Sequence, residues 1–108
     1  MSDAVQSLAE ELRTRIDTTK TTGMTATYQF ATADQPDGEA YARIVNGEVE
    51  IAEGQAPQAD IVLTATAANW HAVFHGELSG QMAFLTGKLK IRGDMSLAMK
   101  LQSLFHLS

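Results

Sequence analysis

The sequence predicts an α+β fold with two layers, in which a five-stranded, mostly antiparallel sheet is covered on one face by helices. Five segments alternate apolar and polar residues, which is the period of strands that bury one face. Other segments space their apolar residues three and four positions apart, as amphipathic helices do. Helices packed on one side of such a sheet give a two-layer arrangement.

Residues 1–108 are expected to form one domain, because the chain has the length of a single core and shows no linker or internal repeat. Cysteine is absent, which excludes disulfides, a thiol nucleophile and a thiolate metal site. The first element is a predicted helix over residues 2–18, ended by Gly23. Its apolar stripe consists of Val5, Leu8, Ala9, Leu12 and Ile16.

Residues 24–32 are predicted to be the first strand, with Met24, Ala26, Tyr28 and Phe30 on the buried face and Thr25, Thr27 and Gln29 on the other. Residues 34–38 have the composition of a turn. Strands are expected over 39–45 and 48–53, joined at Asn46-Gly47, because both residues tolerate the positive φ of a type I′ hairpin turn.

Residues 60–66 are predicted to be the fourth strand. Thr66 is a suitable N-cap for a helix reaching to about residue 77, whose apolar face is Trp70, Val73 and Phe74. A short helical turn is expected over residues 81–86.

The last quarter of the chain reads as a strand followed by an unusually apolar helix. Gly87 and Gly93 bracket the strand 88–92, in which Leu89 and Ile91 alternate with cations. Asp94 is a predicted N-cap for a helix over 95–107. The stripe of this helix is Ala98, Leu101, Leu104 and Phe105, which Met95, Leu97 and Met99 broaden beyond an ordinary core face.

The formal net charge of −5 argues against nucleic-acid binding. Charge is nevertheless segregated, since residues 79–108 carry +3 and residues 1–78 carry −8. Such asymmetry can orient a protein at an anionic surface. The simpler interpretation is that Lys88, Lys90 and Arg92 are the solvated face of one strand.

The sequence contains no convincing catalytic or metal motif. His71 and His75 have the i, i+4 spacing of metal ligands, but the glutamate that assists zinc catalysis is missing between them, and Glu77 is poorly placed as a third ligand. No serine sits in a Gly-x-Ser-x-Gly elbow, and no glycine loop fits a phosphate. We therefore expect no enzymatic activity, no cofactor and no metal.

The run Phe84-Leu-Thr-Gly-Lys-Leu-Lys-Ile-Arg-Gly-Asp-Met95, followed by Leu97-Ala-Met-Lys-Leu101, resembles the C-terminal signature of the sterol carrier protein 2 (sterol-binding) domain. Residues 57–64 and 70–76 resemble the middle of that family, so the similarity extends over residues 46–104. The resemblance implies a five-stranded sheet with helices on one face. It also implies an apolar tunnel between the sheet and the C-terminal helix that takes sterols, fatty acids, acyl-CoAs and phospholipids.

Apart from the resemblance, the apolar residues of the last third would be expected to fill a solid core. With it, they are expected to surround a lipid, because methionine adapts to irregular ligands. Phe105 is expected to line the same space, and the C-terminal helix to act as its gate. The expected tunnel residues are Trp70, Phe74, Met82, Phe84, Leu85, Ile91, Met95, Ala98, Met99 and Leu101.

The leading hypothesis is a non-enzymatic module for binding and transfer of lipids. The alternative is an accessory module that docks through its apolar C-terminal helix on a partner enzyme or on a second copy. The expected partners are a lipid and, transiently, an anionic membrane contacted through Lys88, Lys90, Arg92 and Lys100, with the protein a monomer or weak homodimer. Neither a signal peptide nor a Ser-Lys-Leu end is present, which predicts a bacterial-type cytoplasmic protein.

Overall fold

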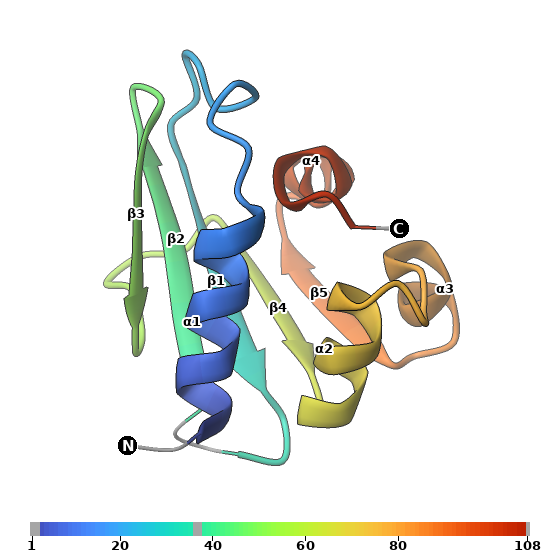
Figure 1. Cartoon of the computed structure of the whole chain (residues 1–108). Helices are drawn as coiled ribbons and strands as arrows, with labels where there is room; N and C mark the ends of the chain where they lie inside the picture. The colour runs from blue at the N-terminus through green and yellow to red at the C-terminus, as the bar shows by residue number, and fades with distance from the viewer. Residues whose placement is uncertain (1–2, 36–37, 108) are drawn as a thin grey trace.

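The computed structural model describes residues 3–35 and 38–107. Pro36 and Asp37 of the expected turn, and the side chain of Val5, lie outside the described residues. The chain runs through nine elements in this part (Figure 1): α1 Asp3–Arg15, β1 Ala26–Thr32, β2 Glu39–Val45, β3 Glu48–Glu53, β4 Ile61–Ala65, α2 Ala67–Phe74, α3 Gly80–Leu85, β5 Leu89–Gly93 and α4 Met95–Phe105.

The five strands form one sheet in the order β3-β2-β1-β4-β5, so β1 is central and β3 and β5 are the edges. Every neighbouring pair is antiparallel except β1 and β4, which run parallel with Tyr28 opposite Ile61. The predicted hairpin is confirmed, since Val45 pairs with Glu48 across Asn46 and Gly47, whose φ angles are 51° and 85°. The predicted α+β class and mostly antiparallel sheet are therefore confirmed.

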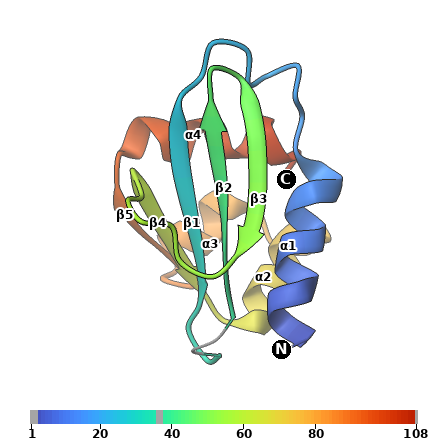
Figure 2. The same cartoon turned by 90° about the vertical axis from the view of Figure 1, so that its left-hand side faces the viewer.

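The helices pack on one face of this sheet and leave the other face open. Helix α1 contacts β2 and β3, whereas α4 contacts β4 and β5. Figure 2 shows the sheet from its open side, with α4 crossing behind the strands. Between the layers, Tyr28 and Phe30 of β1 meet the fully buried Phe105 of α4 edge-to-face, at 6.4 and 5.6 Å between ring centroids.

Side chains at the helix starts satisfy backbone amides there, as the sequence predicts at Thr66 and Asp94. The Thr66 hydroxyl accepts from the amide of Asn69, and the Asp94 carboxylate accepts from that of Ser96. Ser79 caps α3 in the same way through the amide of Met82. The helices end earlier than predicted, because Gly76 adopts φ 76° after α2 and His106 adopts φ 52° after α4.

The alternation of β1 predicts that Gln29 faces water. In the structure, Gln29 is instead buried, on the open side of the sheet. The connection after β3 folds over this side chain. The amide nitrogen of Gln29 donates to the carbonyl of Gly54 at 3.0 Å, and its amide oxygen accepts from the backbone N–H of Ala56 at 2.8 Å. A primary amide can satisfy donors and acceptors of a loop together, so burial here leaves its polar atoms bonded.

Candidate functional site

A groove of about 320 Å³ opens between α3, β5 and α4. This volume is at the lower end of the range of small-molecule sites, roughly 300–1,000 Å³. Its lining residues come from these three elements and from Leu107, just after α4. They are Gly80, Gln81, Phe84, Leu89, Ile91, Met95, Ala98, Met99, Leu101, Gln102 and Leu107.

The groove lining is apolar apart from two primary amides, and none of its residues carries a charge. Leu89 and Ile91 are the inward residues of β5, as the alternation predicts, while Phe84 and Met99 come from the flanking helices. Met99 is 81% exposed, so the groove wall is in contact with solvent. A surface of this kind can hold a hydrocarbon chain by burial, without directed polar contacts.

Helix α4 divides its side chains between the core and the groove. Leu104 and Phe105 are buried in the core, whereas Met95, Ala98 and Met99 line the groove. Phe105, which we expect from the sequence to surround the ligand, instead belongs to the solid aromatic core. The reason is that β1 offers Tyr28 and Phe30 at the same level, and their rings fill the space beside it.

Polar contacts fix α4 at its start, in its first turn and at its end. At its start, the backbone N–H of Asp94 donates to the carbonyl of Asp60 at 3.0 Å. The Tyr28 hydroxyl donates to the carbonyl of Leu97 at 2.9 Å. At its end, the backbone N–H of Asp17 donates to the carbonyl of Leu104 at 2.7 Å, and His106 Nε2 lies 3.1 Å from Asp17 Oδ2. A movable gate formed by the whole of α4 would break all of these contacts.

Helix α3 is much less embedded than α4. Of its six residues only Ala83 is buried, while Met82 and Leu85 are 52% and 67% exposed. Both side chains were expected to line a tunnel, but they project from α3 and do not line the groove. The backbone N–H of Lys88 donates to the Ala83 carbonyl at 2.8 Å, which ties the helix to the start of β5.

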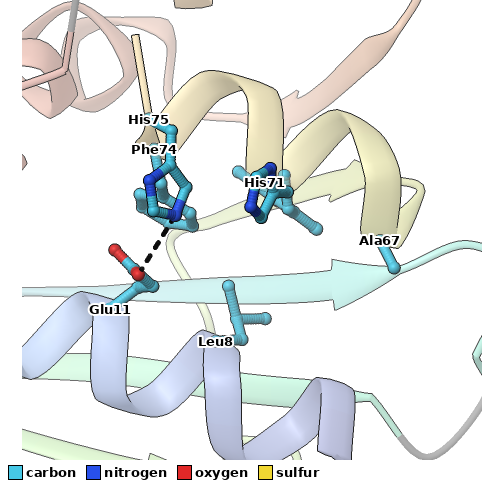
Figure 3. A pocket seen from close by; sticks show the side chains of 7 residues that line it. Leu8, Glu11, Ala67, His71, Phe74 and His75 are labelled. Atoms are coloured by element: carbon cyan, nitrogen blue, oxygen red, sulfur yellow. Dashed lines mark ion pairs between the residues drawn. The ribbon is translucent and has the colours of Figure 1, made fainter. Parts of the chain in front are cut away.

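Trp70 and Phe74 lie on a second concavity of about 300 Å³ between α1 and α2 (Figure 3). Its other lining residues are Leu8, Glu11, Ala67, His71 and His75. The rings of Trp70 and Phe74 stack with centroids 5.7 Å apart, and the indole N–H donates to the carbonyl of Ala31 at 2.9 Å. Through Phe30, which meets Trp70 edge-to-face, these rings join the core aromatics rather than the groove.

The polar rim of this second concavity is already internally paired. Glu11 accepts from Arg15 Nε at 2.8 Å and lies 3.5 Å from His75 Nε2, as the dashed line in Figure 3 marks. The His71 and His75 rings stack with centroids 4.2 Å apart. Within residues 3–35 and 38–107, no three histidine or acidic side chains are placed to hold a metal ion.

Of the ten side chains expected around a ligand, the structure gathers six along the groove: Phe84, Ile91, Met95, Ala98, Met99 and Leu101. Sequence reasoning omitted Leu89, Leu107, Gly80, Gln81 and Gln102. Leu89 could have been included, because it shares the inward face of its strand with Ile91. The two glutamines offered no such signal, since polar residues near a helix surface are ordinary.

No helix in the described ranges has the length and apolar character needed to cross a membrane.

A model of the SCP-2 sterol transfer family matches residues 6–106. Among curated proteins, the chain is 33% identical over 102 residues to hydroxysteroid dehydrogenase-like protein 2 of Xenopus tropicalis, covering 94% of this chain and 23% of that protein. The chain thus spans about a quarter of the length of this relative.

Solved structures share the fold. Sterol carrier protein 2 like 2 of Aedes aegypti aligns in its crystal structure with a TM-score of 0.73 at 20% identity, covering 94% of this chain and 95% of that one. The solution structure of the same protein in palmitated form gives a TM-score of 0.68 at 18% identity, covering 98% and 96%. The sec-alkylsulfatase Pisa1 of Pseudomonas sp. aligns with a TM-score of 0.73 at 23% identity, covering 87% of this chain and 15% of the sulfatase.

Proposed function

The chain belongs to the SCP-2 sterol transfer family, and we propose that it is a non-enzymatic carrier that holds one long-chain fatty acid or acyl-CoA in the groove between α3, β5 and α4. Membership in this family supports lipid binding and transfer in general. We assign the specific site to the groove, and its uncharged, largely apolar lining is the observation that supports this assignment.

The free energy available from such a groove is sufficient for a carrier. Each methylene removed from water is worth about 0.8 kcal/mol, so burying on the order of ten gives roughly 8 kcal/mol before ordering costs. That corresponds to an affinity close to micromolar, at about 8.2 kcal/mol. The mosquito protein of the same fold has been solved in palmitated form, which favours an acyl chain as the ligand class. Selectivity among acyl chains should be broad, because no charged group lines the groove.

A fluorescent fatty-acid titration tests this proposal. We expect saturable binding tighter than about 100 μM, equivalent to about 5.5 kcal/mol. Ala98→Trp should fill the groove and weaken binding at least tenfold. Ala68→Trp, an exposed alanine of α2 outside the groove, is the matched control and should bind as the parent does.

The emission of Trp70 decides between the two concavities. Trp70 is the only tryptophan and lines the concavity between α1 and α2. A fatty acid held in the groove should leave its emission nearly unchanged, whereas one bound beside α2 should alter it. The assignment to the groove would be wrong if Ala98→Trp left fatty-acid affinity unchanged and the Trp70 emission of the parent changed on binding.

A second candidate function is an accessory module that docks on an enzyme. The observation that favours it is the small share of larger proteins that this fold occupies, at 23% of the dehydrogenase-like relative and 15% of the sulfatase. The exposed apolar side chains beside the groove would then be a protein interface. Native mass spectrometry separates the two, since co-purified lipid on a monomer supports the carrier and a lipid-free dimer or hetero-complex supports docking.

A carrier also has to exchange its lipid with a membrane. We assign this transient contact to the exposed cations Lys88, Lys90, Arg92 and Lys100. Transfer from anionic vesicles should then slow as salt rises, because a Debye length of roughly 8 Å at physiological ionic strength shrinks further in added salt. We propose that the carrier does this as a monomer or weak homodimer in the cytoplasm.

A further inference from the structure

The groove differs between its two ends along α4. At the start of the helix, the groove residues Met95 and Met99 are exposed. Beyond them Leu101 is buried, and Leu107, which follows the helix, is half-buried and packs against the core. Helix α4 rises about 15 Å between its first and last residues, so Met95 and Leu107 lie at opposite ends of the lining. The groove is therefore open to water at the start of α4 and bounded by Leu107 at the other end.

Leu107 reaches the groove because the chain reverses directly after α4. His106 adopts φ 52° and ψ 46°, the left-handed conformation. The backbone N–H of His106 donates to the carbonyl of Gln102, and that of Leu107 donates to the same carbonyl at 3.0 Å. In a helix end of this type, the residue after the left-handed position folds back on the last turn. Glycine usually occupies that position, and among the described residues other than glycine, Asn46 alone shares a positive φ with His106.

The loop after α1 holds His106 in this conformation. The Nε2 atom of His106 lies 3.1 Å from Asp17 Oδ2, and the backbone N–H of Asp17 donates to the carbonyl of Leu104 at 2.7 Å. The backbone N–H of Thr19 donates to Asp17 Oδ1 at 2.9 Å, which orients the carboxylate so that its other oxygen meets the His106 ring. Backbone and side-chain contacts together thus set the direction in which the chain leaves α4.

We infer that Leu107 is the end wall of the groove and sets the longest acyl chain that it accepts, and that His106 positions this wall through its left-handed backbone and its contact with Asp17. The inference rests on the proposed function, because it concerns the same groove. The methyl end of the fatty acid lies against Leu107, and its carboxylate lies at the exposed Met95 end, where the charge stays hydrated. Chains up to this length are accepted without further distinction, in keeping with the uncharged lining.

Displacement of the fluorescent fatty acid by laurate, myristate, palmitate, stearate and arachidate tests the end wall. With the parent, affinity should rise about fourfold for each further methylene, equivalent to about 0.8 kcal/mol. It should level off at one acid, because the remaining carbons of longer acids stay in water. Leu107→Ala should move this levelling point to the next longer acid, and Leu107→Trp should move it to the next shorter one. An unchanged levelling point in both variants would overturn the role of Leu107.

Substitutions of His106 test its positioning role. His106→Val should act as Leu107→Ala does, since a β-branched residue opposes the left-handed backbone and has no group to bond Asp17. His106→Asn should keep the levelling point of the parent, because asparagine tolerates this backbone and its amide can donate to Asp17. Asn46→Val is the matched control. It opposes the same backbone conformation at the β2–β3 hairpin, outside the groove, and should leave the levelling point unchanged.

The outcomes separate this inference from the proposed function. No saturable binding of any acid by the parent would refute the proposed function and this inference together. Binding that Ala98→Trp weakens, with a levelling point that no variant moves, would refute this inference alone. A levelling point that shifts equally in His106→Val and Asn46→Val would trace the shift to general destabilisation, which urea denaturation of both variants measures, and would overturn the positioning role of His106.

Discussion

The two halves of α4 use similar apolar residues in opposite ways. The second half is buried, with Phe105 packed against β1. The Leu104 carbonyl accepts from the backbone N–H of Asp17, and the His106 ring after the helix contacts the Asp17 carboxylate. In the first half, Leu97 is buried, but Met95 and Met99 are exposed along the groove. The exposed half is by composition the more apolar, with four apolar residues of five in 95–99 against three of six in 100–105. Burial rather than composition therefore distinguishes structural from binding residues.

This difference predicts that stability and lipid binding can be separated along a single helix. Substitutions in the second half remove contacts of a packed interior, where lost volume is costly. Substitutions of Met95 and Met99 in the first half remove side chains that already contact water, and should affect ligand binding rather than folding.

The largest expected effect is that of Phe105→Ala. It deletes a ring packed against Tyr28 and Phe30, so we expect a loss of about 3–5 kcal/mol in the free energy of unfolding. Met99→Ala, six residues earlier in the exposed half, should change it by less than about 0.5 kcal/mol. Urea denaturation measures both. Comparable losses for the two variants would contradict the division of α4.

Gly93→Ala should have the next largest effect, because it lies at the junction between β5 and α4. Gly93 has φ 118°, and an added Cβ would collide with the carbonyl of Asp60 and lie 2.9 Å from Ile61 Cα. We expect a loss of about 1–3 kcal/mol. Gly87→Ala is the control, since its φ is 78° but nothing lies within 4 Å of the new Cβ. If both substitutions cost the same by urea denaturation, the collision is unimportant and only backbone strain matters.

Tyr28 is expected to make the stability of the folded protein sensitive to alkaline pH. Burial, with a smaller contribution from the charge of Asp94, raises the pKa of Tyr28 to about 12. The folded protein therefore holds this proton more tightly than the unfolded chain does. The resulting stability is present below about pH 10 and is lost as pH rises from there toward the folded value, by up to about 1.4 kcal/mol per pH unit.

Tyr28→Phe should abolish this alkaline loss. At neutral pH it should cost about 1 kcal/mol, because the carbonyl of Leu97 loses the hydrogen bond from the Tyr28 hydroxyl. Denaturation of both proteins at several values of pH measures the difference. Parallel curves above pH 10 would mean that another group titrates in that range.

The smallest expected effect is that of Asp17→Asn at the end of α4. Hydrogen bonds from the hydroxyl and backbone N–H of Thr19, with a further contribution from His106, lower the pKa of Asp17. Its contribution to stability is therefore present above the unfolded pKa, about 3.9, and is lost as pH falls through the lowered folded value. The variant should differ slightly from the parent at neutral pH, and the two urea midpoints should converge in acid. A difference that persists unchanged in acid would rule out this titration as the cause.

Sequence patterns could predict what each strand buries and where helices begin. Alternation placed Leu89 and Ile91 on the inward face of the β5 edge, and the chemistry of Thr66 and Asp94 identified two N-caps. These are local properties, because a capping oxygen or a twofold period acts within a few residues. The resemblance of residues 46–104 to a known family added the overall arrangement.

Distant contacts could not be predicted in the same way. Gln29 is buried by a loop more than twenty residues further along the chain, which the alternation of its own strand does not indicate. Whether Phe105 or Met99 faces the groove depends on which rings β1 presents, since both lie on a helix whose apolar face is broad. A six-residue helix such as α3 has too few residues to define a face, so the exposure of Met82 and Leu85 was not foreseen.

The parallel pairing of β1 with β4 has a consequence for how the chain reaches this structure. Strands β1, β2 and β3 form a meander of neighbours that can assemble as soon as it has been synthesised. Tyr28 and Phe30 then remain uncovered until residues 61–65 pair with β1 and α4 supplies Phe105, more than seventy residues later. Pairings distant in sequence form slowly, so the apolar face of the nascent meander stays exposed until α4 has packed on it. Truncation within α4 should therefore yield an aggregating meander rather than a smaller folded protein.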